Sequence, residues 1–240
     1  MLPLERQNKI LEILAERKSA TVEDLCAMLY SSGATIRRDL TVMENAGLLR
    51  RTHGGAVYMD GSSRDYPLMM RENENMIAKT MMAKEALSYI RDGQTLFMDS
   101  SSTVAHLASR LAGFKQLRVI TNGLKTASIL SEIGGVEVYG TGGRLRGNAK
   151  SFVGPQTVDT VRRFHADAVF FSCRGVDPAT GITDSAEEEA EIKRLYIQNA
   201  KKAFLMCDGS KLGKQYFCRI VGVNEVSKII TNVQLPPEYR

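Results

Sequence analysis

Short apolar runs alternate with helical segments between residues 96 and 230, and this order constrains the fold more than any other feature of the chain. The runs have the composition of buried strands and cover residues 96–98, 117–120, 136–139, 168–171, 203–206 and 228–230. Helical patterns stand between most of them, at residues 103–111, 124–133 and 187–199. Because a helix is the usual crossover between parallel strands, this order predicts an α/β domain with a largely parallel sheet.

Polar and cationic residues follow five of these runs. Ligands of open α/β sheets bind beyond the carboxyl ends of the strands, so these residues should line one site. In chain order they are Asp99, Ser100, Ser101, Ser102 and Thr103, then Thr121, Asn122 and Gly123, then Gly142, Gly143 and Arg144, then Cys173, Arg174 and Gly175, and finally Asp208, Ser210 and Lys211. Hydroxyl and free N–H groups at a helix start bind anions, and Arg144 and Lys211 add positive charge. We therefore predict a site for one phosphorylated, hydroxyl-rich ligand whose hydroxyls bind Asp99, Asn122 and Asp208.

Each of these segments also has a purely structural interpretation. The serines at 100–102 can serve as a helix N-cap, and the glycines between residues 140 and 143 can form only a turn. These glycines are not a dinucleotide-binding motif, because Leu145 occupies the third glycine position, and no P-loop is present. Cys173 and Cys207 are by default buried apolar side chains.

An acidic run at residues 187–191 opens the last predicted helix. Negative charge is favourable in the first turn of a helix, and Glu189 and Lys193 stand four residues apart, as a surface ion pair does. The pattern favours a solvated helix start over a catalytic role.

The N-terminal residues have the order of a helix-turn-helix unit. Residues 4–16 have a helical apolar period, and Thr21 can cap a second helix with Asp24 at the third helical position of a capping box. A glycine-containing turn at residues 30–33 then leads into a third helix that starts near Ala34. Two helices, a tight turn and a further helix make up this DNA-binding motif.

The third helix has an apolar face and a basic face. Ile36, Leu40 and Met43 recur at i, i+4 and i+7, which predicts packing inward, while Arg37 and Arg38 lie on other sides. Guanidinium groups bind phosphate oxygens or the O6 and N7 atoms of guanine. Short strands at 48–51 and 56–58 would add a basic hairpin wing. The predicted DNA contacts are Ser31, Ser32, Ala34, Thr35, Arg37, Arg38, Thr41, Arg51, His53, Gly54 and Gly55.

Two adjacent arginines alone would be better explained by a solvated amphipathic helix, and Gly54 and Gly55 by a simple turn. The formal net charge of +5 suits an anionic partner. Residues 1–57, however, contain eight Lys and Arg against seven Asp and Glu. Since this module carries little net charge, tight binding to DNA should require a homo-oligomer, a dimer or a tetramer.

Several classes of protein are disfavoured. No apolar run approaches the roughly 20 residues of a membrane span, and Met1 begins on a polar helix rather than a signal peptide, so we expect a cytoplasmic location. Four cysteines and three histidines show no ligand spacing, so we expect no metal, no disulfide and no cofactor.

The sequence resembles the DeoR family of bacterial transcriptional regulators. The resemblance rests on TIRRDL at residues 35–40 and GLLRRTHGGA at residues 47–56, after an N-terminal helix of the RQNKILEIL type. It implies a winged helix-turn-helix followed by a sugar-phosphate-sensing domain related in fold to ribose-5-phosphate isomerase. Residues 99–103 resemble the D-S-G-T-T phosphate loop of the family, with serines where glycine and threonine are usual. Thr121 and Asn122 match its T-N pair, Gly142 and Gly143 its G-G turn, and residues 208–211 its D-x-S-K segment.

The predicted architecture is an N-terminal all-α winged helix-turn-helix (1–58), a linker (59–71) and a mostly parallel α/β effector domain (72–240), with a helix from residue 72 to residue 90. The predicted function is a DNA-binding repressor of a carbohydrate-use operon that responds to a phosphorylated sugar. The alternative is a phosphosugar isomerase in which Asp208 or Asp177 is the base and Lys211 stabilises charge. A third hypothesis, an RNA-binding or scaffold protein, is less favoured because no RNA-module motif is present.

Overall fold

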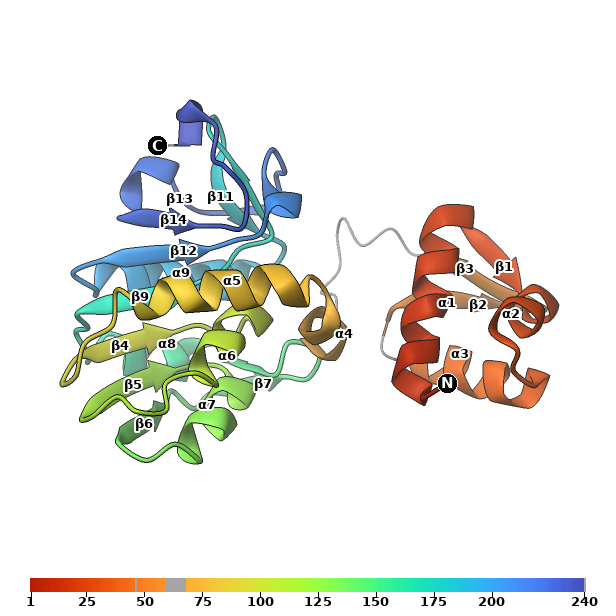
Figure 1. Cartoon of the computed structure of the whole chain (residues 1–240), viewed down its shortest axis with the longest axis horizontal. Helices are drawn as coiled ribbons and strands as arrows, with labels where there is room; N and C mark the ends of the chain where they lie inside the picture. The colour runs from red at the N-terminus through yellow and green to blue at the C-terminus, as the bar shows by residue number, and fades with distance from the viewer. Residues whose placement is uncertain (46, 59–67, 240) are drawn as a thin grey trace. The chain divides into compact units, whose positions relative to one another are not determined.

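The chain divides into two compact units, Met1–Met70 and Arg71–Arg240 (Figure 1). The computed structural model describes residues 1–45, 47–58 and 68–239. Between residues 3 and 58, the described residues form α1 (Pro3–Arg17), β1 (Ser19–Thr21), α2 (Val22–Leu29), α3 (Gly33–Asn45), β2 (Leu49–Thr52) and β3 (Gly55–Tyr58). The strands make an antiparallel sheet of order β1-β3-β2. The predicted helices and hairpin are confirmed, whereas β1 was not predicted, because a strand this short has no readable period.

The first unit is held together by the apolar face of α3. Ile36, Leu40 and Met43 are fully buried, as their spacing predicts. Burying each such side chain stabilises the fold by roughly 1.5–3 kcal/mol. The Thr21 hydroxyl accepts the Asp24 N–H at 3.0 Å, and the Asp24 carboxylate accepts the Thr21 N–H at 3.1 Å, which forms the predicted capping box.

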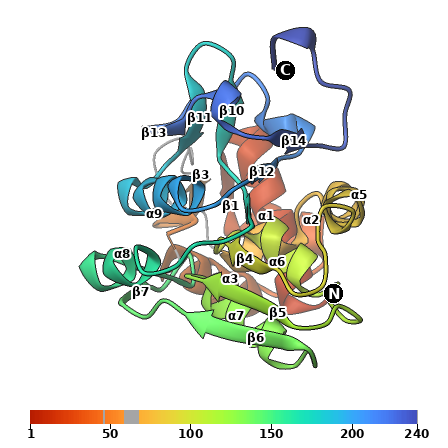
Figure 2. The ribbon, with the colours of Figure 1, turned by 90° about the vertical axis from the view of Figure 1, so that its left-hand side faces the viewer.

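The second unit is built on a parallel sheet of order β14-β12-β9-β4-β5-β6 (Figure 1; Figure 2 shows the chain turned by 90°). Its strands are β4 (Thr95–Met98), β5 (Leu117–Thr121), β6 (Val136–Gly140), β9 (Ala168–Phe171), β12 (Ala203–Met206) and β14 (Lys228–Ile230). The predicted α/β class with a mostly parallel sheet is confirmed.

Helices cover both faces of this sheet. They are α5 (Met76–Leu87), α6 (Ser102–Ala108), α7 (Leu124–Ser131), α8 (Pro155–Val161) and α9 (Glu187–Gln198). Alternate residues of a strand point to opposite faces. Accordingly, Phe97 packs with Val161 of α8 and Tyr196 of α9, whereas Leu96 packs on the other face with Met82 of α5. The ligand site predicted from the sequence lies at the carboxyl ends of these strands.

Smaller strands outside the main sheet were not predicted. β7 (Arg144–Arg146) and β8 (Ser151–Val153) form a hairpin, and β10 (Gly175–Asp177), β11 (Gly181–Asp184) and β13 (Cys218–Val221) form a second sheet. Short 3-10 helices are η2 (Gly209–Lys211), η3 (Val223–Glu225) and η4 (Pro237–Tyr239). These elements are too short to carry a clear hydrophobic period.

The segment between the two units differs in part from the prediction. Residues 59–67 of the expected linker lie outside the described residues, and residues 68–71 belong to α4 (Leu68–Asn73). The single helix expected from residue 72 is divided into α4 and α5, because Asn75 adopts a left-handed conformation with φ of 50°. Within the described residues, no helix is both long enough and apolar enough to span a membrane.

Candidate DNA-binding surface and effector site

Helix α3 presents its basic side to solvent. Arg37 and Arg38 are both exposed, and so are Ala34 and Thr41. The apolar face of the helix is buried in the core, so both guanidinium groups remain accessible to a nucleic acid duplex.

The one acid in the first half of α3 is withdrawn from this surface. The Asp39 carboxylate is 5% exposed and accepts hydrogen bonds from Arg6 Nε at 2.5 Å and Gln7 Nε2 at 3.1 Å. Because α1 supplies these donors, the negative charge of Asp39 is matched inside the fold. The outward side of α3 is therefore cationic, although the whole unit is nearly neutral.

Hydroxyl groups shape the start of α3. Ser32 Oγ accepts the Thr35 N–H at 3.3 Å and lies 2.9 Å from Thr35 Oγ1, and Ser31 Oγ donates to the Leu29 carbonyl at 3.1 Å. Of these hydroxyl residues, Ser32 is exposed and the other two are half-buried. The free N–H groups of a helix start suit a phosphate group, so Ser32 stands where a DNA backbone could bind.

Arg51 of the wing is directed onto α3. Its guanidinium donates to Thr41 Oγ1 at 2.7 Å and its N–H donates to Glu44 Oε1 at 2.8 Å. Arg51 is half-buried, whereas its neighbour Arg50 is exposed. The structure therefore gives Arg51 a role in joining the wing to the helix.

The two glycines of the wing differ. A Cβ on Gly55 would lie 2.1 Å from the Ala20 carbonyl oxygen, so only glycine fits against β1. Gly54 has open space around the corresponding position, and both Gly54 and His53 are exposed. Packing explains Gly55, while His53 and Gly54 remain accessible.

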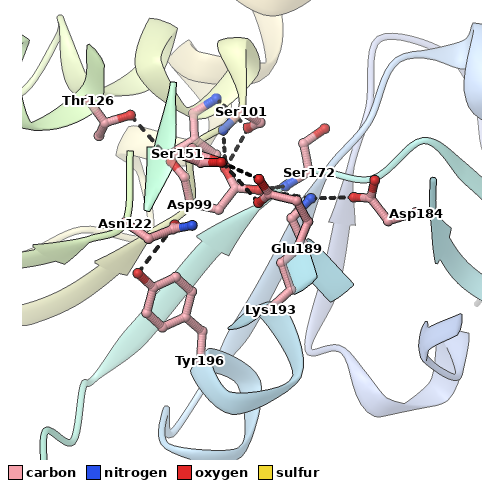
Figure 3. A network of polar contacts seen from close by, with 12 residues as sticks. Asp99, Ser101, Asn122, Thr126, Ser151, Ser172, Asp184, Glu189, Lys193 and Tyr196 are labelled. Carbon is pink, nitrogen blue, oxygen red and sulfur yellow. Dashed lines mark hydrogen bonds and ion pairs between the residues drawn. The ribbon is translucent and has the colours of Figure 1, made fainter. Parts of the chain in front are cut away.

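In the second unit, the loop after β4 closes around Asp99 (Figure 3). This carboxylate is 1% exposed and accepts the Ser101 N–H at 2.9 Å, the Ser101 hydroxyl at 2.5 Å and the Ser172 N–H at 2.9 Å. Ser101 also caps α6 by accepting the Val104 N–H at 3.2 Å. Asp99 thus ties the end of β4 to the end of β9, and the N-cap interpretation is confirmed for Ser101. Ser102 and Thr103 are buried in the first turn of α6.

Glu189 and Lys193 belong to the same network, which sequence reasoning missed. They are only 5% and 6% exposed, so the predicted solvated pair is wrong for these two residues. Glu189 accepts hydrogen bonds from Ser100 Oγ at 3.2 Å, from Arg146 at 3.0 Å and from the Ser151 hydroxyl. The side of α9 that carries Glu189 and Lys193 packs against the strand ends, whereas Glu187 and Glu191 are exposed. The sequence does contain a signal for this burial. Tyr196 stands seven residues after Glu189, a spacing that places both on one face of the helix, and Tyr196 is buried.

Lys193 bridges two buried carboxylates. Its ammonium lies 2.5 Å from Asp184 and 3.5 Å from Asp99. Burial disfavours the charged form of Asp184, but the charge of Lys193 and its hydrogen bond outweigh burial and lower the pKa of this carboxyl group. For Lys193 the same balance raises the pKa, because the charges of Asp184 and Asp99 outweigh burial.

The second predicted loop is buried against β8 and α9. Asn122 Nδ2 donates to the Phe152 carbonyl at 3.2 Å, and the Tyr196 hydroxyl donates to Asn122 Oδ1 at 3.4 Å. Thr121 Oγ1 accepts the Gly123 N–H at 3.0 Å. A Cβ on Gly123 would lie 2.8 Å from the backbone of the first loop, so the two loops approach each other closely at a glycine.

The third loop keeps further from the buried network. Gly142 and Gly143 have positive φ angles of 65° and 109°, and a Cβ on Gly143 would lie 2.3 Å from Thr157 Oγ1. The turn interpretation therefore accounts for both glycines. Arg144 is exposed and donates to both carboxylate oxygens of Glu188, at 2.6 and 2.8 Å.

The fourth segment follows β9. Cys173 and Cys207 are buried free thiols that interact with each other, which agrees with the default interpretation. A Cβ on Gly175 would lie 2.2 Å from the Lys214 carbonyl oxygen, so packing requires this glycine. Arg174 is half-buried.

The fifth segment reaches back to the fourth. Asp208 caps η2 by accepting the Ser210 N–H at 3.0 Å and the Ser210 hydroxyl, and Lys211 Nζ donates to Ser172 Oγ at 2.9 Å. Burial raises the pKa of Asp208, but the Ser210 hydrogen bond and the Lys211 charge together lower it. The structure thus brings the first, second, fourth and fifth segments together and leaves Arg144 at the surface.

A further buried cation was absent from the predicted set. Lys79 of α5 is 4% exposed, and its ammonium donates to the main-chain carbonyl of Arg71 in α4. Burial, followed by the nearby charge of Lys211, lowers the pKa of Lys79 to about 8. No group of three His, Cys, Asp or Glu side chains within the described ranges could hold a metal ion.

An exposed basic helix in a winged helix-turn-helix unit, followed by an α/β unit with a polar site at its strand ends, defines a transcriptional regulator with its own sensor domain. Residues 6–62 match the family described as DeoR-like helix-turn-helix domain, and residues 74–233 match the DeoR C terminal sensor domain. The chain belongs to the DeoR family of transcriptional regulators. Regulators of this family are not enzymes, so the isomerase alternative is wrong. Asp177 instead shapes a local turn by accepting the N–H groups of Ala179 and Thr180, both at 3.0 Å.

Relatives align with almost the entire chain. The uncharacterized HTH-type transcriptional regulator YulB of Bacillus subtilis is 37% identical over 99% of this chain and 92% of its own length. The transcriptional repressor GlcR of the same organism is 32% identical over 95% and 88%, respectively. The L-fucose operon activator of Escherichia coli is 30% identical over 95% and 94%.

One solved structure shares much of this fold. The delta subunit of eIF2B from Chaetomium thermophilum aligns with 68% of this chain and 58% of its own at a TM-score of 0.50 and 14% identity. A ribose-5-phosphate isomerase in complex with phospho-erythronic acid aligns with 56% of this chain and 52% of its own at a TM-score of 0.41 and 16% identity.

Proposed function

We propose that this regulator represses an operon for carbohydrate use and that a phosphorylated sugar, bound at the strand ends of the second unit, changes its hold on the operator. The observation that carries the DNA-binding part is the pair of exposed guanidinium groups, Arg37 and Arg38, on a helix whose acid Asp39 is buried. The relative named as an L-fucose operon activator supports the link to carbohydrate use, and the relative named as a transcriptional repressor supports repression. Such a regulator acts where the DNA is, in the cytoplasm.

We assign DNA contact to the accessible members of the predicted set. These are Ser32, Ala34, Arg37, Arg38, Thr41, His53 and Gly54. The remaining members, Ser31, Thr35, Arg51 and Gly55, support the helix start and the wing. We assign these contacts to a DNA-binding domain of residues 1–58.

We assign the effector to the buried loops after β4, β5, β9 and β12. The hydroxyl groups of Ser100 and Ser172 and the amide of Asn122 match a sugar, and Lys211 supplies charge for its phosphate. Lys193 and Glu189 already satisfy neighbouring groups, so their role is to hold the loops in place.

Tight binding to DNA should need more than one copy of the chain. Eight basic and seven acidic residues in residues 1–57 provide little long-range attraction to a duplex. A homo-oligomer presents two or more basic helices at once and gains effective concentration at the second half-site. The effector then acts by preferring one arrangement of the oligomer, because equal affinity for both arrangements would shift nothing.

Gel-shift titration on a duplex selected from a random-sequence pool tests this proposal. Arg38→Ala should weaken binding by about tenfold or more and reduce the salt dependence by about one ion, because one phosphate contact is lost. Arg162→Ala, which removes an exposed arginine at the end of α8, is the matched control. Unchanged affinity in a folded Arg38→Ala variant would contradict the assignment of α3.

The effector part has its own measurement. A panel of sugar phosphates and the corresponding free sugars is added to the DNA complex and, separately, to the protein during thermal unfolding. We expect one phosphorylated sugar to raise the melting temperature and change DNA affinity, while its free sugar does neither. A chain that binds DNA but responds to none of them would disprove the effector class.

A further inference from the structure

Most cations around the effector site already have a carboxylate partner. Lys193 pairs with Asp184 at 2.5 Å, Arg146 with Glu189 at 3.0 Å, and Arg144 with Glu188 at 2.6 Å. These side chains have little positive charge left to offer a ligand, because the protein itself matches it.

Lys79 is different from these cations. Among the described residues, no carboxylate oxygen lies within 4.0 Å of its ammonium, although the side chain is 96% buried. Its hydrogen bond goes to the main-chain carbonyl of Arg71. An ammonium group has three N–H donors, and burying one without a counterion is unfavourable. The protein retains a buried, incompletely satisfied cation at this position.

Lys211 of η2 is a second cation beyond the strand ends, and it is half-buried. Its ammonium donates to Ser172 Oγ at 2.9 Å and forms no ion pair within the described part of the chain. The start of α5 is linked to the turn that carries Lys211. Asn75, one helical turn before Lys79, is hydrogen-bonded through its side chain to Asp208, and the Asp208 carbonyl accepts the Lys211 N–H at 3.1 Å. After burial, the positive charge of Lys211 has the largest effect on the pKa of Lys79. The other charged groups that act on Lys79 are Glu74, Asp208 and Arg71, and Lys79 in turn acts on His106 of α6. Two like charges held together favour a dianion between them.

We propose that Lys79 and Lys211 together bind the phosphate dianion of the effector, and that Lys79 is also the latch through which this anion acts on α4. This inference rests on the proposed function, and it names the coupling residue. In the free protein, the Lys79 ammonium holds the Arg71 carbonyl near the end of α4. When phosphate binds, the Lys79 ammonium donates its hydrogen bond to the phosphate instead of to the Arg71 carbonyl, because a charged acceptor forms a stronger hydrogen bond than a carbonyl. The Arg71 carbonyl is then released.

The length and position of helix α4 make it sensitive to the loss of this hydrogen bond. It spans Leu68–Asn73, and the boundary between the two compact units falls inside it, between Met70 and Arg71. A helix this short depends on bonds to its last carbonyls, since it has few internal ones. Loss of the Lys79 bond therefore changes the helix through which the chain passes from the DNA-binding unit to the sensor.

The protonation of Lys79 agrees with this geometry. Burial, together with the positive charge of Lys211, lowers its pKa to about 8, so near neutral pH the lysine is poised to gain or lose a proton. A dianion favours the protonated form. Phosphate affinity should consequently fall as the pH rises above about 8, by up to about tenfold per pH unit.

The test compares Lys79→Met with Lys84→Met, which removes an exposed lysine from the same helix. Thermal unfolding is followed with inorganic phosphate against chloride at equal ionic strength. We expect Lys79→Met to lose the phosphate-induced rise in melting temperature, which corresponds to at least about a tenfold loss of affinity, while Lys84→Met keeps it. Circular dichroism and cooperative unfolding establish that both variants are folded.

The proposed action of Lys79 on α4 leads to a second prediction, which phosphate binding alone does not make. Because Lys79→Met also lacks the bond to Arg71, its DNA affinity without effector should equal that of the effector-bound wild type. The same phosphate response in Lys79→Met and Lys84→Met would overturn the anion site. Loss of phosphate binding with the DNA affinity of the effector-free wild type would overturn the latch. If no sugar phosphate alters the wild-type complex, the proposed function fails, while the comparison in inorganic phosphate still decides the anion site.

Discussion

The ammonium group of Lys193 lies 2.5 Å from the carboxylate of Asp184, and both side chains are buried. This ion pair joins α9 to β11, and the second contact of Lys193 with Asp99, at 3.5 Å, extends it to the end of β4. The strands β4 and β11 and the helix α9 are thereby joined around one charged group.

Replacing one partner of this ion pair should be strongly destabilising. Lys193→Met leaves two buried carboxylates without their cation, which typically costs about 3–5 kcal/mol. Lys201→Met, which removes an exposed lysine that pairs with Asp167, should change stability by less than about 1 kcal/mol. Urea unfolding of the two variants measures the difference. Equal stabilities would show that the buried pair does not hold the sensor together.

Lys79→Met should have the opposite effect on stability. The pKa of Lys79 is lowered to about 8 in the folded protein, below its ordinary value of 10.5, so the unfolded chain binds its proton more tightly. At pH 7 without phosphate, the variant should be more stable by about 1–3 kcal/mol, because the buried charge is gone. The advantage should shrink as the pH rises from about 8 to about 10.5, where the folded wild type loses the proton first. Unfolding measured across this pH range would contradict the account if wild type and variant ran parallel.

The wing glycines provide a matched pair of substitutions. Gly55→Ala places a Cβ 2.1 Å from the Ala20 carbonyl oxygen, so strand β3 must move away from β1. We expect a loss of about 2 kcal/mol or more in the first unit and weaker DNA binding, since overpacking against a backbone atom cannot be relieved by a side-chain rotation. Gly54→Ala meets open space and should keep its stability within about 0.5 kcal/mol. Thermal unfolding separates the two.

Removal of the Asp39 carboxylate should affect the DNA-binding unit through its core. Asp39→Ala leaves Arg6, which is 9% exposed, and Gln7 without their acceptor. The expected cost is about 3 kcal/mol, because an unpaired charge then remains buried. Hydrogen exchange of α1 and α3 amides should increase, while amides of the sensor sheet remain protected. Increased exchange spread evenly over both units would argue against this local role.

Much of the fold was predictable because it depends on patterns along the chain. The spacing of Ile36, Leu40 and Met43 predicts the buried face of α3, and Thr21 with Asp24 predicts the start of α2. The six apolar runs predict the parallel sheet, since buried strands need continuous apolar residues. Short strands such as β1 and β7 have too few residues to show a period, so they were missed.

The site was only partly predictable, because its members are selected by contacts across the fold. Residues that follow a strand can be located from the sequence, and Asp99, Asn122 and Lys211 do meet at the strand ends. The spacing of Glu189 and Lys193 is the same for a solvated pair as for two buried groups with separate partners. Local pattern carries no information on which alternative is correct.

What the sequence by itself determined was the order and type of the main elements and the DeoR class of regulator, because periodicity, capping and motifs are local properties of the chain. What only the tertiary structure decided was the pairing of charges. Asp39 is neutralised by Arg6, Lys193 by Asp184, and Lys79 is left with a carbonyl of α4. The physical reason is that burial sets the energy of a charge, and burial depends on how the helices and strands pack against one another in the fold.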